Sequence, residues 1–195
     1  MQAFVIPADR RLDSARGFTL IELMIVVAIA AILITIGAPA LGEFMADQRV
    51  RTATSDIAAE ISFARAKAIE NSRRVYIART GALWRNGWRV YVDLNNNGAY
   101  DAAPIDEELK RFDGFPATGT MYVCSTLADF ATHVIFRPDG RVVRSAGAVP
   151  GATDGIYVVD TMGGAAVAKN KIRQLLFGLS GRVTVVKLNG TAAPC

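Results

Sequence analysis

A long apolar segment near the N-terminus constrains this chain more than any other feature. Residues 18–40 (FTLIELMIVVAIAAILITIGAPA) contain one ionisable side chain, that of Glu22. As an α-helix this segment would be about 34 Å long, enough to cross the roughly 30 Å hydrocarbon core of a bilayer. Arg10, Arg11 and Arg16 precede it. Because basic residues stay on the cytoplasmic side, we expect the rest of the chain on the other side of the membrane.

Two other kinds of N-terminal segment fit part of this pattern. A secretory signal peptide has a shorter apolar core and is cleaved behind it at small residues, whereas Ala38-Pro39-Ala40 carries a proline there. A plain signal anchor gives no reason for a glutamate as the fifth residue of the segment. A charged side chain at membrane depth costs about 2.5–3.5 kcal/mol on insertion scales, so Glu22 indicates a function.

The start of the apolar segment carries a family resemblance. Residues 16–23 (RGFTLIEL) resemble the class III signal of type IV pilins and type II secretion pseudopilins. The resemblance implies that a prepilin peptidase cuts between Gly17 and Phe18 and methylates the new N-terminus at Phe18. Residues 1–17 would then be a leader peptide, and Pro39 would lie where many pilins have a helix-breaking proline.

The chemistry of the cleaved end agrees with this resemblance. Once cut, Phe18 would carry a positive amine in apolar surroundings, and Glu22 of a neighbouring subunit could neutralise it. A paired buried charge costs far less than a lone one, which would favour the packing of helices into a bundle. Alternatively, Glu22 stabilises only the N-terminus of its own helix, by about 0.3–1 kcal/mol. We expect residues 18–45 to be a transmembrane and assembly helix.

The helical pattern continues to about Glu70, but with one apolar stripe and charged residues on the other faces. The stripe consists of Val50, Ala53, Ile57, Ile61, Ala64 and Ala68. Apolar residues three or four positions apart share one face of a helix, so this half should pack on a sheet. Pro39, with Gly37 and Gly42 nearby, should kink the helix or melt it locally.

From Val75 onward the sequence predicts β-structure. Short runs of β-branched and aromatic residues are separated by turn signals such as Asn86-Gly87 and Ser180-Gly181. The expected strands are residues 75–79, 88–93, 108–112, 120–124, 133–136, 141–144, 156–160, 171–177 and 182–188. A long helix followed by strands predicts an α+β fold, with the helix packed on antiparallel sheet. We expect residues 46–195 to be this periplasmic domain.

Further motifs narrow the family. The segments 61–69 (ISFARAKAI), 88–93 (WRVYVD) and 136–141 (FRPDGR) are similar, in this order, to the GspH/FimT branch of minor pilins and pseudopilins. The resemblance implies a subunit that assembles into or primes a type IV pilus or a type II secretion pseudopilus. Its partners would be the prepilin peptidase, an inner-membrane assembly platform and other pilins. It would sit in the inner membrane and then in the filament, near the tip.

The loop after the second expected strand looks like the first half of a calcium loop. Oxygen-bearing side chains are suitably spaced, and glycine is the sixth residue. The candidate ligands are Asp93, Asn95, Asn97 and Asp101. The twelfth position, where a bidentate glutamate belongs, is Pro104, and Asp106 or the two glutamates after it would have to substitute. An Asx-rich hairpin turn explains the same residues without metal, and the sequence favours that alternative. No cofactor is required.

The chain has two cysteines and one histidine, and these small numbers limit the metal sites and disulfides that it can form. They are Cys124, Cys195 and His133, too few for a four-ligand Cys/His zinc site. Disulfides persist in the periplasm. A Cys124–Cys195 bridge would close a loop of about 70 residues, worth roughly 4 kcal/mol in the chain-entropy model, and we expect it. Unpaired thiols or a disulfide with a partner protein are the alternatives.

DNA is a candidate partner through the family resemblance and not through overall charge, which is only +4. Some GspH/FimT-like minor pilins contact DNA through a basic patch near a C-terminal Gly-Arg motif. Arg182 matches that arginine, but Thr184 stands where a second basic residue would be expected, and Lys187 is the next cation. Arg141 follows a glycine in the same way and could join the patch. Other cations of the late strands are Arg144, Lys169, Lys171 and Arg173.

Nothing in the sequence indicates an enzyme. It contains neither a G-x-S-x-G nucleophile elbow nor a P-loop motif. The single histidine, His133, lies in an expected strand, where a lone histidine is usually structural. An anchored periplasmic enzyme is therefore the least supported of the three candidate functions.

Overall fold

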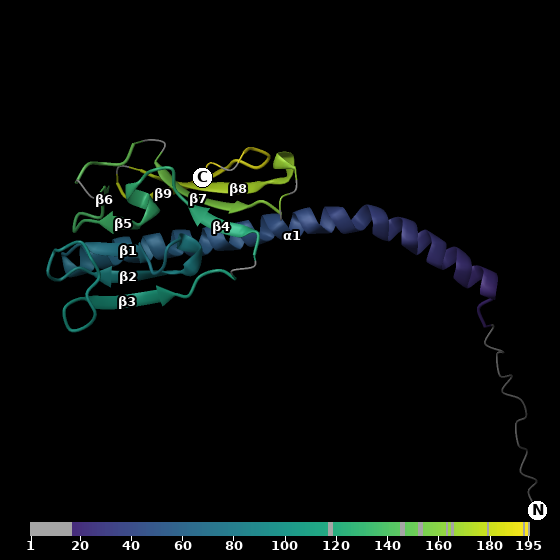
Figure 1. The fold of residues 1–195 in the computed structure, drawn as a ribbon, viewed down its shortest axis with the longest axis horizontal. Coiled ribbons are helices and arrows are strands. Elements are labelled where there is room, and N and C mark those ends of the chain that lie inside the picture. The colour runs from purple at the N-terminus through teal and green to yellow at the C-terminus, as the bar shows by residue number, and fades with distance from the viewer. Residues whose placement is uncertain are drawn as a thin grey trace, which may run out of the picture. The chain divides into compact units, whose positions relative to one another are not determined.

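The chain divides into two compact units, residues 1–41 and 42–195. The computed structural model describes residues 17–116, 119–144, 147–151, 154–162, 164, 166–178, 180–192 and 194. One long helix, α1 (Leu20–Asn71), runs through the end of the first unit into the second, and the strands gather along its C-terminal half (Figure 1). The predicted boundary between residues 45 and 46 falls just inside the second unit.

Nine strands occur in the described part of the second unit, and each corresponds to a predicted one. They are β1 (Val75–Arg79), β2 (Trp88–Val92), β3 (Glu107–Phe112), β4 (Met121–Cys124), β5 (His133–Phe136), β6 (Val142–Val143), β7 (Gly155–Asp160), β8 (Lys171–Phe177) and β9 (Val183–Lys187). The fold is α+β, a long N-terminal helix packed on antiparallel sheet, as predicted from the sequence.

The strands form two sheets, a division that the strand pattern does not reveal. One sheet has the order β3-β2-β1-β5-β6 and the other the order β4-β7-β8-β9. All neighbouring strands are antiparallel. The chain therefore leaves the first sheet after β3, enters the second with β4, and returns to the first for β5 and β6.

The predicted apolar stripe of α1 is buried, with no member more than 6 % exposed. Its side chains belong to one core cluster with residues of both sheets. Trp84 and Trp88 pack there beside Phe130 and Phe136. Because each fully buried side chain of this size contributes about 1.5–3 kcal/mol, this core holds the helix on the two sheets.

The helix does not break at Pro39. α1 is continuous through this residue, so the predicted local melting is wrong. Proline lacks a backbone N–H and therefore removes one hydrogen bond, the one to the carbonyl of residue 35. The bonds of the preceding and following turns remain, and they are sufficient to keep the helical conformation.

Candidate functional site

The predicted cleavage site lies just before the start of α1. Gly17 and Phe18 precede α1, and the side chain of Phe18 is 81 % exposed. Thr19 Oγ1 accepts a hydrogen bond from the backbone N–H of Glu22 at 3.2 Å. Thr19 therefore caps the helix, a role that the Thr-x-x-Glu pattern signals and that our sequence interpretation missed. Glu22 lies in the first turn, where the helix dipole also favours a carboxylate.

The first half of α1 exposes almost all of its apolar side chains. Within the described residues, α1 is the one helix long and apolar enough to cross a membrane, and none of its most apolar stretch is buried in this chain. Isoleucine, leucine, valine and methionine side chains between residues 20 and 36 are more than half exposed. Such a surface requires a non-aqueous partner, either lipid or other protein helices.

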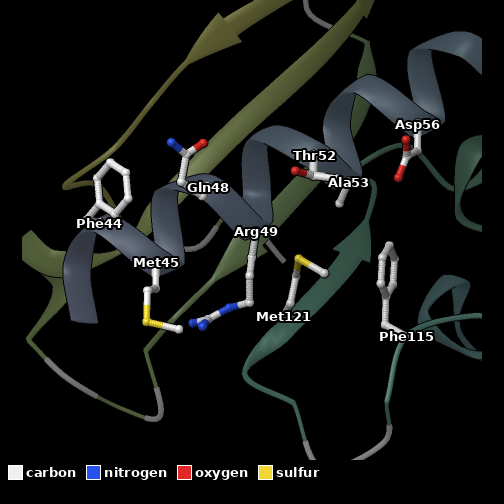
Figure 2. A pocket seen from close by; sticks show the side chains of 9 residues that line it. All are labelled: Phe44, Met45, Gln48, Arg49, Thr52, Ala53, Asp56, Phe115 and Met121. Carbon is white, nitrogen blue, oxygen red and sulfur yellow. The ribbon is translucent and has the colours of Figure 1, made fainter. Parts of the chain in front are cut away.

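An apolar groove follows on α1 within the second unit. Its volume is about 480 Å³. The lining residues are Phe44, Met45, Gln48, Arg49, Thr52, Ala53, Asp56, Phe115 and Met121. Figure 2 shows the thioethers of Met45 and Met121 near the Arg49 side chain at one end, and the Phe115 ring near Asp56 at the other. Apolar side chains form most of the wall of the groove, which suits packing against another apolar surface.

Arg49 also anchors this part of α1 to the second sheet. Its Nε and Nη2 donate to Asp160 Oδ2 at 3.0 and 2.8 Å. Asp160 is fully buried, and its Oδ1 accepts from the Thr120 hydroxyl and the Met162 N–H. Burial alone would raise the pKa of Asp160, but these hydrogen bonds and the Arg49 charge hold it below its ordinary value.

Cations in β8 and just before it pair with acids of α1. Glu43 lies 3.4 Å from Lys169 Nζ and 3.3 Å from Lys171 Nζ, and Asp47 lies 3.4 Å from Arg173. Hydrogen bonds and charge from Lys171 and then Lys169 lower the pKa of Glu43. Three cations that the sequence offered for a basic patch are therefore engaged in holding the helix.

Two Gly-Arg turns meet beside α1. Gly140 and Gly181 both have a positive φ, 76° and 77°. A Cβ on Gly181 would collide with the carbonyl oxygen of Gly140, so the two turns are in direct contact. Arg65 Nε, from α1, donates to the carbonyls of Gly140 and Ser180 at 3.1 and 3.2 Å. The arginines that follow the two glycines are both exposed.

The predicted DNA-binding residues are only partly brought together. Arg141 and Arg182 each follow one of the two touching glycines. Lys187 lies at the other end of β9, about 13 Å from the start of that strand by its length. Burial raises the pKa of Asp47, but a hydrogen bond from Asn189 and the charge of Arg173 lower it. The charge of Lys187 adds to this lowering. Lys187 therefore does not belong to the Gly-Arg surface.

The four candidate calcium ligands lie in the loop between β2 and β3, and hydrogen bonds join Asn95 and Asn97 to Asp101. Asp93 Oδ2 accepts from the Gly98 N–H at 3.0 Å. Asn95 and Asn97 each donate from Nδ2 to Asp101 Oδ2, at 2.8 and 2.6 Å. Their Oδ1 atoms accept backbone N–H groups two residues further on, which are Asx turns. The predicted Asx-rich turn is thus present, and all four predicted ligands take part in it.

Parts of two predictions lie outside the described residues. Cys124 ends β4 and is half-buried, but Cys195 is not among the residues that the structure describes. The Cys124–Cys195 disulfide therefore stays a prediction. Residues 1–16 of the predicted leader are likewise outside the described part of the chain.

Comparisons with known proteins bear on the N-terminal segment and on most of the second unit. The family model of the type II transport protein GspH matches residues 53–164, and that of the prokaryotic N-terminal methylation motif matches residues 12–38. No curated protein matches. Two crystal structures of the type IV minor pilin FimU from Pseudomonas aeruginosa are similar. One is 18 % identical with a TM-score of 0.48, covering 77 % of this chain and 96 % of that one. The other is 17 % identical with a TM-score of 0.45, covering 70 % and 91 %.

Proposed function

Because the chain belongs to the GspH family of type II transport proteins, a family of minor pilins and pseudopilins, we propose that it is a filament subunit. It assembles into, or primes, a type IV pilus or a type II secretion pseudopilus. The methylation motif at residues 12–38 supports processing of its N-terminus by a prepilin peptidase. In this proposal the second unit lies in the periplasm, and the subunit leaves the inner membrane through the assembly platform for a place near the filament tip.

The exposed apolar half of α1 is the observation that carries this proposal. None of its most apolar stretch is buried within the chain, although the second half of the same helix buries its stripe completely. A bilayer can cover these side chains before assembly, and helices of sister subunits can cover them afterwards. Transfer of this surface from one apolar environment to another costs little free energy, so the transfer is physically feasible.

Pairing of Glu22 would favour the filament over the membrane. It is the only charge among residues 18–40. In lipid it is unpaired, whereas in a filament the methylated amine of a neighbour's Phe18 would neutralise it. Assembly would thus relieve part of the cost of a lone charge in the membrane, which is about 2.5–3.5 kcal/mol at the centre of a span. Thr19 Oγ1 accepts the backbone N–H of Glu22, and the Glu22 carboxylate would be available to a neighbour.

In the second unit, Phe44 and Met45 line the apolar groove. These two side chains are 60 % and 51 % exposed. We propose that the assembly helix of a sister subunit covers them in the filament. Aromatic and methionine side chains are typical of such interfaces, because they offer large and adaptable apolar contact.

The experiment compares Glu22→Gln with Glu70→Gln in cells that assemble the filament. Glu70 is an exposed carboxylate at the opposite end of α1, 62 % exposed and paired with Lys67. Both variants should insert into the membrane and be cleaved after Gly17, since the cleavage site is intact. Glu22→Gln should be lost from sheared filaments, while Glu70→Gln enters them normally. Normal incorporation of Glu22→Gln would show that the carboxylate serves only its own helix.

DNA binding is a second candidate function, favoured by the contact between the two Gly-Arg turns. This contact places the turns that carry Arg141 and Arg182 side by side. Both arginines are exposed, which suits phosphate contacts. The ion pairs of Lys169, Lys171 and Arg173 with α1 limit the patch to this small surface.

A titration of the detergent-solubilised chain with duplex DNA at two salt concentrations tests this function. Phosphate contacts release counterions, so genuine binding should weaken steeply as salt rises. Arg182→Ala should weaken binding, whereas Arg111→Ala, an exposed arginine on β3, should not. If the wild-type chain shows no binding at low salt, the Gly-Arg surface of the isolated subunit does not bind DNA.

A further inference from the structure

We propose that the loop between β2 and β3 binds a calcium ion through Asp93, Asn95, Asn97 and Asp101. Neither family match concerns a metal. All four residues lie in one loop of the second unit, in which Asp93 is buried and Asn95 and Asn97 are exposed.

A buried oxygen atom without a partner is the observation that points to a cation. Asp93 is completely buried. Its Oδ2 accepts the Gly98 N–H, but its Oδ1 has no hydrogen-bond partner. The Tyr76 hydroxyl lies beside Asp93: burial, then the charge of Asp93 and a weak hydrogen-bonding contact with it, raise the pKa of Tyr76, but that contact falls short of a well-formed hydrogen bond to Oδ1. A buried charged group that lacks a partner is costly, and a cation would supply one.

The backbone of the loop has the sharp turn that such a site needs. Asn96 and Gly98 both have a positive φ, 58° and 79°. Gly98 is the sixth residue counted from Asp93, and its N–H points back to the first carboxylate. In calcium loops a glycine at the sixth position allows the chain to turn around the ion. This turn brings the third and fifth side chains of the loop to the ninth, and it holds the first carboxylate against the Gly98 N–H.

Three of the four side chains meet at one atom. Asn95 and Asn97 both donate to Asp101 Oδ2, so the two amides and this carboxylate lie next to one another. Each amide Oδ1 accepts only one backbone N–H, which leaves a second lone pair for a metal. Oxygen ligands from carboxylates and amides are those that calcium prefers.

Asp106 closes the loop instead of replacing the glutamate missing at Pro104. It is 2 % exposed, and its two oxygens accept the N–H groups of Leu94 and Asp101 at 2.9 and 2.8 Å. In the described part of the chain, no three His, Cys, Asp or Glu side chains are placed to hold a metal. The site therefore depends on amide oxygens and two carboxylates. We expect weak affinity, with a Kd of about 10⁻⁴–10⁻³ M, as in extracellular calcium modules.

The test measures thermal unfolding of the full chain in detergent, by tryptophan fluorescence, with chelator or with calcium chloride up to millimolar concentrations. Calcium should raise Tm in a saturable way, because it binds the folded state. Magnesium should raise it less, since it requires a stricter octahedral geometry. Isothermal titration should give one calcium ion per chain.

Two loop variants and one control assign the response to the site. Asp93→Asn should abolish the rise in Tm, and Asp101→Asn should raise the calcium concentration for half-saturation at least tenfold. Asp113→Asn changes a carboxylate that is 95 % exposed just after β3, and should respond as the wild type does. If Asp93→Asn does not fold, Asp101→Asn decides. A wild-type chain without a calcium response at 10 mM, or a response that both loop variants retain, overturns the proposal.

Discussion

At the scale of single residues, two glycines determine how the two Gly-Arg turns meet. Gly140 and Gly181 adopt left-handed backbone conformations that side chains rarely tolerate, and they touch through the backbone. Arg65 binds a carbonyl from each turn. A helix side chain and two hairpins, distant in sequence, are therefore packed so closely that no room remains for even one methyl group.

Gly181→Ala should lower the free energy of unfolding by about 2–5 kcal/mol, from the strained φ together with the collision with Gly140. Gly190→Ala is the matched control, because Gly190 has φ 80° but only an ordinary contact with Ala168. It should cost about 1–2 kcal/mol, the backbone contribution alone. Denaturant unfolding of both variants gives the comparison. Equal losses would mean that the two turns do not press on each other.

At the scale of elements, α1 is held on the second sheet by ion pairs as well as by its apolar stripe. Glu43 and Asp47 pair with cations around β8, and Asp160, at the end of β7, pairs with Arg49. The pKa values of all three carboxyls are lower than usual. Lowered carboxyl pKa values in the folded state mean that ionisation of these groups stabilises the attachment of the helix.

Acid should therefore loosen this attachment. The stabilisation is complete above the ordinary pKa values of 4.5 for Glu43 and 3.8 for the aspartates, and it is lost as pH falls through the lower folded values. The free energy of unfolding, measured with denaturant from pH 7 to pH 3, should decrease mainly below about pH 4. A double variant, Glu43→Gln with Asp47→Asn, should lose less over that range, whereas Asp113→Asn should follow the wild type. An unchanged pH dependence in the double variant would contradict this account.

At the scale of the whole molecule, the two units meet opposite requirements. The second unit buries a hydrophobic core formed by its own residues. The described part of the first unit buries none of its most apolar stretch and depends on a membrane or on other subunits. In the proposed mechanism, cleavage of the leader would allow assembly, because it would create the amine that Glu22 neutralises.

We predict a mature chain that begins at methylated Phe18. Intact-mass measurement of protein extracted from membranes of cells with an active prepilin peptidase should show the loss of residues 1–17 and the gain of one methyl group. The same protein from cells without the peptidase should retain the leader. A mature N-terminus near Leu41 would instead identify a secretory signal peptide and would contradict the proposed assembly mechanism.

Local patterns in the sequence were sufficient for the elements and for the family. The nine strands, the buried stripe from Val50 to Ala68 and the apolar half of α1 all follow from periodicities over a few residues, because side-chain direction repeats with the backbone. The motif around Gly17 and Phe18 is likewise contiguous. The local melting at Pro39 was wrong because one lost hydrogen bond was weighed without the helical turns around it.

Only the tertiary structure decided how distant residues combine. The division of the strands into two sheets, the contact of Gly140 with Gly181, and the pairing of Lys171 with Glu43 all join positions far apart in the chain. The unpartnered Oδ1 of Asp93 is of the same kind, since burial depends on everything packed around it. Such arrangements depend on packing and charge across the whole unit, and no local repeat in the sequence records them.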